Sequence, residues 1–125
     1  MNKVANYHGL NVNFLKSNSL DCQKLLLSGI SVSSPSNGDT VTISDNACGV
    51  IIAPKGPLVG SVNLVFPQNP QDSQVLLISF TQDVQNLVIQ DVIFANKSNP
   101  SGNIKAGDSV MLYYDMSSKK WYKLC

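Results

Sequence analysis

The chain has 125 residues, a formal net charge of +1 and 43% hydrophobic residues. This length indicates one domain, with a short appendage, that is large enough to bury a core. Only 14% of the residues are charged, and neither Arg nor Glu occurs, so the chain lacks the clustered basic stripe of a nucleic-acid-binding protein.

Residues 1–28 differ from the rest, because asparagines alternate with scattered apolar residues. Two interpretations stay open: a short helix that begins at Ser19 and ends at Gly29, or a strand-like stem that is stable when copies wrap around a shared axis, which we prefer. Met1 to Leu10 contains no apolar core of a signal peptide. The apolar runs are far shorter than the ~20 residues of a membrane span. We therefore expect a soluble protein made in the cytoplasm without export.

The segment from Ile30 to Ala53 reads as short strands separated by turns. Asn37-Gly38 is a strong turn dipeptide. Residues 39–44 place Val41 and Ile43 on one face and hydroxyl side chains on the other, which is typical of a half-solvated antiparallel strand. Asp45-Asn46 predicts another turn, and residues 50–53 a strand that ends at Pro54.

The clearest pattern is a pair of strands, 61–66 and 74–80, joined by residues 67–73. That connector carries two prolines, which cannot donate to a sheet ladder, so it must be a loop. Val75–Phe80 is apolar on both faces, which indicates a strand that is buried on both sides. In a small sandwich this predicts a central strand with a subunit interface behind it.

Further strands are predicted over residues 84–89, 92–94, 109–114 and 121–124, with a polar loop at 96–103 and a hairpin loop at 115–120. Strand signals every 8–12 residues, with turn residues between them, indicate a sandwich or barrel. We predict an all-β fold, an antiparallel β-sandwich of jelly-roll type over residues 29–125, preceded by an arm or stem over residues 1–28 that anchors or trimerises the chain.

No set of catalytic residues accompanies these strands. His8 is the only histidine and no GxSxG motif occurs. Apart from Asp21, the aspartates sit almost entirely at turns, where Asp bonds the nearby backbone; they are Asp39, Asp45, Asp72, Asp83, Asp91, Asp108 and Asp115. We expect no catalytic, cofactor-binding or metal-binding residue. A weaker hypothesis is a hydrolase that uses an aspartate pair, for which Asp72 and Asp115 are the residues to test.

The three cysteines, Cys22, Cys48 and Cys125, show no CxxC spacing and are odd in number. Unpaired thiols are the expectation. A Cys22–Cys48 bridge and an intermolecular bridge through Cys125 are the alternatives.

Four aromatic residues gather near the C-terminus: Tyr113, Tyr114, Trp121 and Tyr122. Such side chains bury large areas, so they commonly fill a core or a subunit interface. They can also stack on sugar rings. We therefore treat these four residues as candidate ligand or interface aromatics.

Residues 38–124 resemble a β-domain of phage tail-fibre, head-fibre and related virion surface proteins. The matching segments are Gly38–Ser44, Ile52–Pro54, Val62–Pro67, Asn69–Asp72, Val75–Phe80, Thr81-Gln82, Val84–Val88, Ala106–Val110, Tyr114-Asp115 and Trp121-Tyr122. Ser73 stands where that family usually has Gly, which predicts a differently shaped turn after Asp72.

The resemblance implies a non-enzymatic, trimeric protein on the surface of a virus particle, in a fibre or as a capsid decoration, with a role in host attachment or particle assembly. Its implied partners are further copies of itself, other virion proteins through residues 1–28, and a host-surface glycan or receptor, with neither nucleic acid nor a membrane. A carbohydrate-binding module is the alternative, because of the aromatic C-terminal segment.

Overall fold

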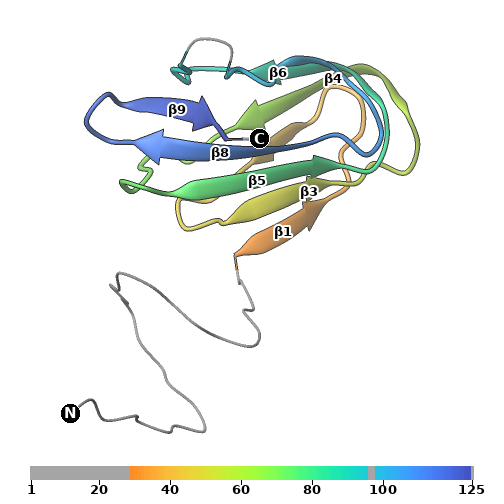
Figure 1. The fold of residues 1–125 in the computed structure, drawn as a ribbon. Helices are drawn as coiled ribbons and strands as arrows, with labels where there is room; N and C mark the ends of the chain where they lie inside the picture. Colours follow the sequence, from red (N-terminus) through yellow and green to blue (C-terminus); the bar gives the residue numbers. More distant parts are fainter. Residues whose placement is uncertain (1–28, 96–97, 125) are drawn as a thin grey trace, which may run out of the picture.

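The computed structural model describes residues 29–95 and 98–124, which form one all-β unit (Figure 1). Within these residues the strands are β1 (Ile30–Ser33), β2 (Thr40–Thr42), β3 (Gly49–Ile52), β4 (Leu58–Val65), β5 (Val75–Phe80), β6 (Val84–Ile89), β7 (Gly102–Ile104), β8 (Ser109–Asp115) and β9 (Lys120–Lys123). No helix occurs in this described part, so the predicted all-β class is confirmed. The arm predicted for residues 1–28 lies outside the described residues.

The strands form two mixed sheets. One sheet has the order β1-β3-β5-β8-β9 and the other β2-β4-β6-β7. From β1 to β6 the chain alternates between the two sheets, so each new strand lies parallel to the strand two positions earlier. β7, β8 and β9 then add antiparallel pairings. Parallel neighbours need a long crossover, and here a strand of the opposite sheet provides it.

The predicted antiparallel jelly-roll sandwich is not confirmed, because the sheets are mixed. Only β5–β8, β6–β7 and β8–β9 pair antiparallel. The prediction rested on alternating polarity and regular turn signals, which show where strands lie and which face is buried. Neither signal specifies the partner of a strand.

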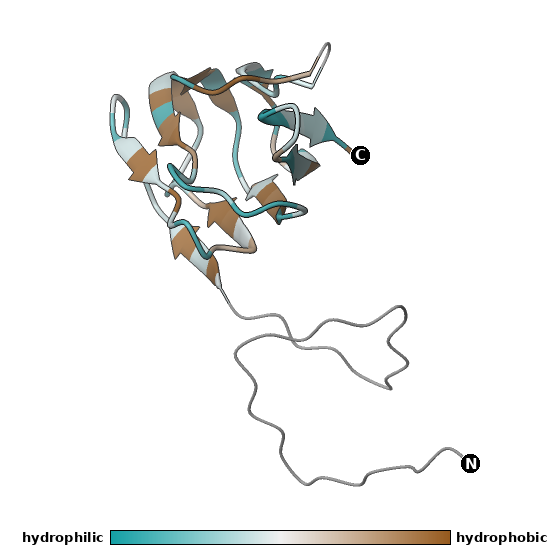
Figure 2. Ribbon diagram, turned by 90° about the vertical axis from the view of Figure 1, so that its left-hand side faces the viewer, coloured by the Kyte–Doolittle hydropathy of each residue, from teal (hydrophilic) through white to brown (hydrophobic). Residues whose placement is uncertain are grey.

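The core lies between the two sheets. The inward side chains of β5, which are Leu76, Ile78 and Phe80, are buried, and β4 contributes Val62 and Leu64 from the opposite layer. Figure 2 shows the two layers from one end, with apolar residues concentrated on the strands.

Several local predictions were met and others were wrong. The turns at Asn37-Gly38 and Asp45-Asn46 are confirmed. Residues 92–94 form no strand and make only an isolated bridge between Phe94 and Trp121. Residues 102–104 form β7 although they read as a polar loop, because β6 supplies their hydrogen-bonding partner.

Ser73 adopts a left-handed conformation, with φ of 65°. Ser73 therefore occupies the backbone region that favours Gly, although it is a serine. Left-handed backbone costs an L-residue roughly 1–2 kcal/mol. We expect Ser73→Gly to be more stable than Ser73→Ala by about 1 kcal/mol, since both variants lose the same hydroxyl and differ only in the Cβ. Urea denaturation of the two variants tests this, and equal midpoints would contradict it.

Candidate functional site

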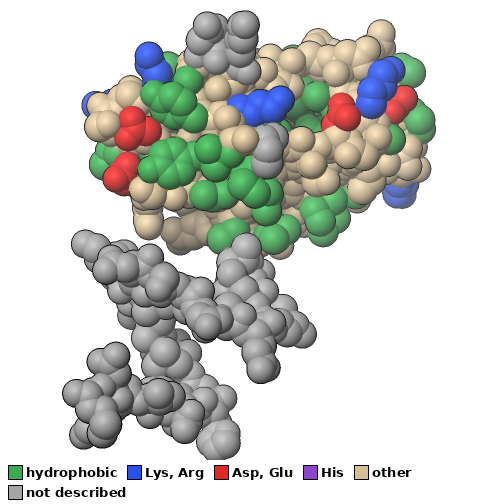
Figure 3. All heavy atoms as spheres, in the orientation of Figure 1, with side chains coloured by type: hydrophobic (Ala, Val, Ile, Leu, Met, Phe, Trp, Pro, Cys, Tyr) green, Lys and Arg blue, Asp and Glu red, His purple; other side chains and the backbone are tan. Residues whose placement is uncertain are grey.

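The outer face of the five-stranded sheet is unusually apolar. Strand register and burial place a contiguous set of apolar side chains on it, called here the apolar sheet face. Its members are Ile30, Val32, Ile51, Val75, Leu77, Met111, Tyr113, Tyr122 and Leu124. Val32 is 67% exposed and Leu124 53% exposed. Figure 3 shows hydrophobic side chains gathered on this side of the molecule.

Cross-strand register explains why these side chains meet. Ile30 lies beside Gly49, Gly49 beside Leu77, and Leu77 beside Met111. Met111 accepts the backbone hydrogen bond of Leu124 at 2.7 Å, which extends the row to the last strand. The row therefore runs from β1 to the residue that follows β9, and Gly49 of β3 is the one position in it without a side chain. A shallow hollow in this face is lined by Ile30, Ile51 and Leu77, together with Ser79 and Ser109.

The outer face of the four-stranded sheet is different in character. Its outward positions are mainly hydroxyl and amide side chains, although three valines lie among them and Val59 is 76% exposed; the positions are Thr40, Thr42, Val59, Ser61, Asn63, Val65, Asn86 and Val88. The inner faces of both sheets pack on the same core, so the two sheets differ mainly in the side chains of their outer faces. Large exposed apolar patches commonly mark contact surfaces, so the apolar sheet face is the leading candidate.

The structure separates the four candidate aromatics into two pairs. Tyr113 lies directly opposite Tyr122 across β8 and β9, and both point outward on the apolar sheet face. Tyr114 lies opposite Trp121, and both point toward the core. The sequence grouped these residues by proximity along the chain. The alternation of side chains along a strand sends neighbours to opposite faces.

Trp121 belongs to the core and is only 3% exposed. Its ring packs edge-on against Phe66, with ring centroids 5.4 Å apart. It lies tilted against the Tyr114 ring, with ring centroids 5.2 Å apart. A buried ring offers no open face on which a sugar can stack. Tyr122 is 38% exposed and shares a hydrogen bond of 3.3 Å with Ser118, while Tyr113 shares one of 3.0 Å with Ser73.

Three aspartates, Asp39, Asp108 and Asp115, accept from backbone three residues away, as the sequence predicted. Three others, Asp45, Asp72 and Asp83, instead accept from loops that are distant in the chain, which the sequence did not predict. Backbone N–H groups donate to the following carboxylates: Asp39, Asp45, Asp72, Asp83, Asp108 and Asp115. Asp72, weighed above as half of an acid pair with Asp115, accepts from the backbone of Met116, the residue after Asp115. The Asp115 carboxylate is held within its own turn, and that of Asp72 is held by the neighbouring hairpin.

Hydrogen bonds lower the pKa of two exposed carboxyls. The pKa of Asp45 falls mainly through the backbone N–H of Asn69, and that of Asp115 through the hydroxyl groups of Ser118 and Ser117. A depressed folded-state pKa stabilises the protein above the unfolded carboxyl pKa, near 4, and this contribution disappears as the pH falls through the folded value. Both side chains are partly exposed, so solvent screens the effect.

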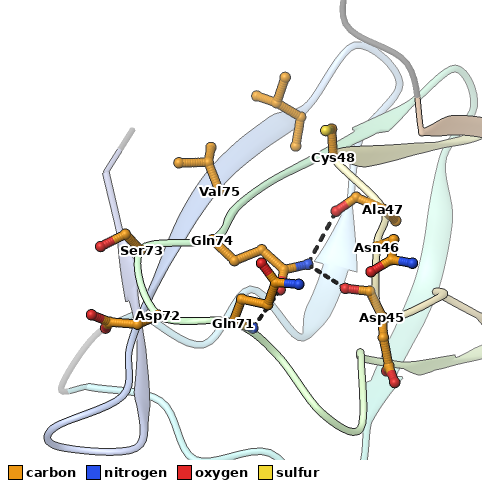
Figure 4. A pocket seen from close by; sticks show the side chains of 10 residues that line it. Asp45, Asn46, Ala47, Cys48, Gln71, Asp72, Ser73, Gln74 and Val75 are labelled. Carbon is orange, nitrogen blue, oxygen red and sulfur yellow. Dashed lines mark hydrogen bonds between the residues drawn. The ribbon is translucent and has the colours of Figure 1, made fainter. Parts of the chain in front are cut away.

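A hollow beside β5 is built around Gln74 (Figure 4). The Gln74 amide donates to the carbonyl oxygens of Asp45 at 3.0 Å and Ala47 at 3.1 Å. It also accepts from the backbone of Gln71 at 2.9 Å. The carboxylates of Asp45 and Asp72 do not point toward one another in this view. The amide thus ties two loops together, which is a structural role.

Among the described residues, no group of three or more His, Cys, Asp and Glu side chains could hold a metal ion. Cys48 is a free, half-buried thiol. His8, Cys22 and Cys125 lie outside the described residues, so the expectations about them stay predictions. In the described ranges, no helix has the length and apolar character needed to cross a membrane.

Sequence reasoning found only part of the apolar sheet face. It identified β5 through Val75 and Leu77, and it identified Tyr113 and Tyr122. It missed Ile30, Val32, Ile51, Met111 and Leu124. The available signal was the apolar character of both faces in residues 50–52 and 110–112, which resembles that of Val75–Phe80.

Comparison with known proteins gave little. No protein-family model matches the chain, and no curated protein matches it. A chain in the solved "Structure of a chaperone-substrate complex" is similar, with 18% sequence identity and a TM-score of 0.43. The match covers 72% of this chain and 14% of that one. At this level the similarity carries no argument about function.

Proposed function

We propose that this chain is a non-enzymatic structural protein of a virion surface, in a fibre or as a capsid decoration, that acts as a homotrimer in host attachment or particle assembly. The observation that carries the proposal is the apolar sheet face. The resemblance of residues 38–124 to virion β-domains supplies the biological setting and the number of subunits. Residues 1–28 are the proposed connection to other virion proteins.

The size of the apolar sheet face suits a protein contact. Five strands spaced about 4.8 Å apart span about 20 Å, and these strands of four to seven residues extend about 13 to 23 Å. Stable interfaces bury roughly 800 Å² on each partner, so this face together with its rim is of the right order. β5 is the middle strand of the five-stranded sheet. A second subunit that packs on the apolar sheet face would therefore bury the outer face of β5, as expected for a strand that is apolar on both faces.

Further copies of the same chain are the proposed cover. Most soluble oligomers contain identical subunits in closed symmetry. Side chains of stacked sheets interdigitate when the sheets lie about 10 Å apart, and the apolar sheet face offers such a layer. Its charged residues are few, so identical faces meet without strong repulsion.

A Leu77→Lys variant is expected to shift the assembly to monomers. Leu77 is half-buried and central on β5, and an ammonium group in an apolar contact lacks a partner for its charge. The matched control is Ser61→Lys, at a half-buried outward position of β4 in the polar sheet. Light scattering after size-exclusion chromatography measures the mass. A monomeric parent at micromolar concentration, or equal behaviour of the two variants, would contradict the proposal.

The location is tested separately by negative-stain imaging of intact particles labelled with an antibody to this chain. We expect label on the particle surface. Purified particles without label would contradict the virion assignment while leaving the oligomer result unaffected.

A carbohydrate-binding module is the second candidate function. This hypothesis rested on the aromatic C-terminal segment, but the Trp121 ring is buried and cannot stack on a sugar. A hollow at the end of the sandwich is a different place at which a sugar can bind. That hollow supports an inference of its own.

A further inference from the structure

A small hollow opens between three loops at the end of the sandwich that carries the β8–β9 hairpin. Its walls come from residues 67–70, residues 91–93 and the hairpin, and its polar lining includes Gln68, Asp91, Tyr114 and Lys119. The volume is about 170 Å³. Pockets for drug-sized ligands occupy roughly 300–1,000 Å³, so this hollow suits one small ring.

The hollow gathers polar groups that the fold leaves without protein partners. Tyr113 and Tyr122 share hydrogen bonds with Ser73 and Ser118, whereas the Tyr114 hydroxyl makes none to another described residue. Asp91 likewise differs from the turn aspartates above, since its carboxylate accepts no hydrogen bond from the described part of the chain. Lys119 forms no ion pair within those same ranges. Three unused polar side chains therefore converge on one site.

The walls of the hollow are held in place. Trp121 donates its backbone N–H to Ile93 at 3.0 Å and accepts from Ala95 at 2.8 Å, which ties the segment containing Asp91 to β9. Within the hairpin, the Ser118 hydroxyl donates to Asp115 at 2.7 Å immediately before Lys119. Asp91 and Lys119 also adopt left-handed backbone, with φ of 57° and 56°. A pre-formed arrangement reduces the ordering cost of binding.

We propose that this hollow binds a single pyranose, either a free sugar or the terminal ring of a surface glycan. Vicinal sugar hydroxyls would donate to the Asp91 carboxylate, while Lys119 donates to a sugar oxygen. The Tyr114 hydroxyl would form a further hydrogen bond with the bound pyranose. A carboxylate at the rim disfavours an anion, and the polar lining disfavours a purely apolar ligand. The inference rests on the proposed attachment role and names its ligand class.

Saturation-transfer NMR with a panel of free monosaccharides tests the site. Glucose, galactose, mannose, N-acetylglucosamine and rhamnose are added singly to the full chain at millimolar concentration. We expect at least one sugar to receive saturation, with a dissociation constant near the millimolar range. Asp91→Asn and Tyr114→Phe should each weaken binding about tenfold, and both preserve side-chain shape. Asn also tolerates the left-handed backbone of position 91.

The matched control is Asp39→Asn, which neutralises a turn carboxylate that does not line the hollow. We expect unchanged binding in this variant. No saturation of any sugar overturns the inference, and so does binding that survives the double variant of Asp91→Asn with Tyr114→Phe. An array of immobilised glycans separates the two sources: signal there as well as in solution identifies a terminal surface sugar, and signal in solution alone identifies a free one.

The outcomes of this test are separate from those of the proposed function. If the chain oligomerises and is detected on particles but binds no sugar, only the proposal of a sugar site in the hollow is refuted. A chain that binds sugar through Asp91 and Tyr114 but is monomeric and absent from particles keeps the hollow as a site and loses the virion role.

Discussion

Replacement of Trp121 by Ala is expected to lower the free energy of unfolding by about 3–5 kcal/mol. The indole is 3% exposed and packs against Phe66 and Tyr114, so the substitution removes a large buried surface and leaves a cavity. Urea denaturation followed by circular dichroism measures the change. Small domains are stable by only about 5–15 kcal/mol, so the loss is a large share of the total.

The neighbouring Tyr122→Ala variant is the control for Trp121, because Tyr122 is adjacent in sequence and points to the opposite face. We expect a loss below about 1 kcal/mol in a monomeric sample. Trp121→Phe provides a folded variant in case the alanine variant is too unstable to purify, and it should show an intermediate loss. A Trp121→Ala protein as stable as the parent would place the indole outside the core.

Gly49→Ala is expected to destabilise the protein by about 1–3 kcal/mol through overpacking. A Cβ at position 49 would lie 2.7 Å from the Leu77 carbonyl oxygen and 3.1 Å from the Leu77 Cβ. The nearest atom belongs to the backbone of the adjacent strand, so β3 and β5 would have to move apart. The same shift would disturb the row of apolar side chains that runs from Ile30 to Leu124.

Gly56→Ala serves as the control for position 49. A Cβ there would meet no heavy atom within 4 Å, so we expect a change within about 0.5 kcal/mol. Thermal and urea unfolding of both variants give the comparison. If Gly49→Ala unfolds at the same urea concentration as Gly56→Ala, the close approach of β3 to β5 is wrong.

Strand positions were largely accessible from the sequence because they depend on local patterns. Val75–Phe80 coincides with β5, and the connector with two prolines ends where β5 begins. Asp39, Asp108 and Asp115 likewise hold local turns, as the preference of Asp for nearby backbone bonds predicts. β7 escaped detection because Gly102–Ile104 carries almost no apolar signal and becomes a strand only beside β6.

The candidate surfaces were harder to predict because they combine distant residues. Ile30 and Leu124 lie near opposite ends of the described chain, yet both belong to one face of one sheet. Asp91, Tyr114 and Lys119 come from a loop, a strand and a hairpin. No spacing along the chain relates these positions to one another, and only the packing of the loops around Trp121 brings them together.

The alternation of apolar and polar side chains, with Pro, Gly and Asp at the turns, was enough to establish an all-β chain and the approximate place of most strands. This works because the two-residue period of a strand is a local property of the backbone. The partner of each strand, the parallel winding between two sheets and the separation of Tyr113 and Tyr122 from Tyr114 and Trp121 came from the folded chain. Those features arise from long-range pairing, in which every strand selects a neighbour that lets the two layers close over a single core.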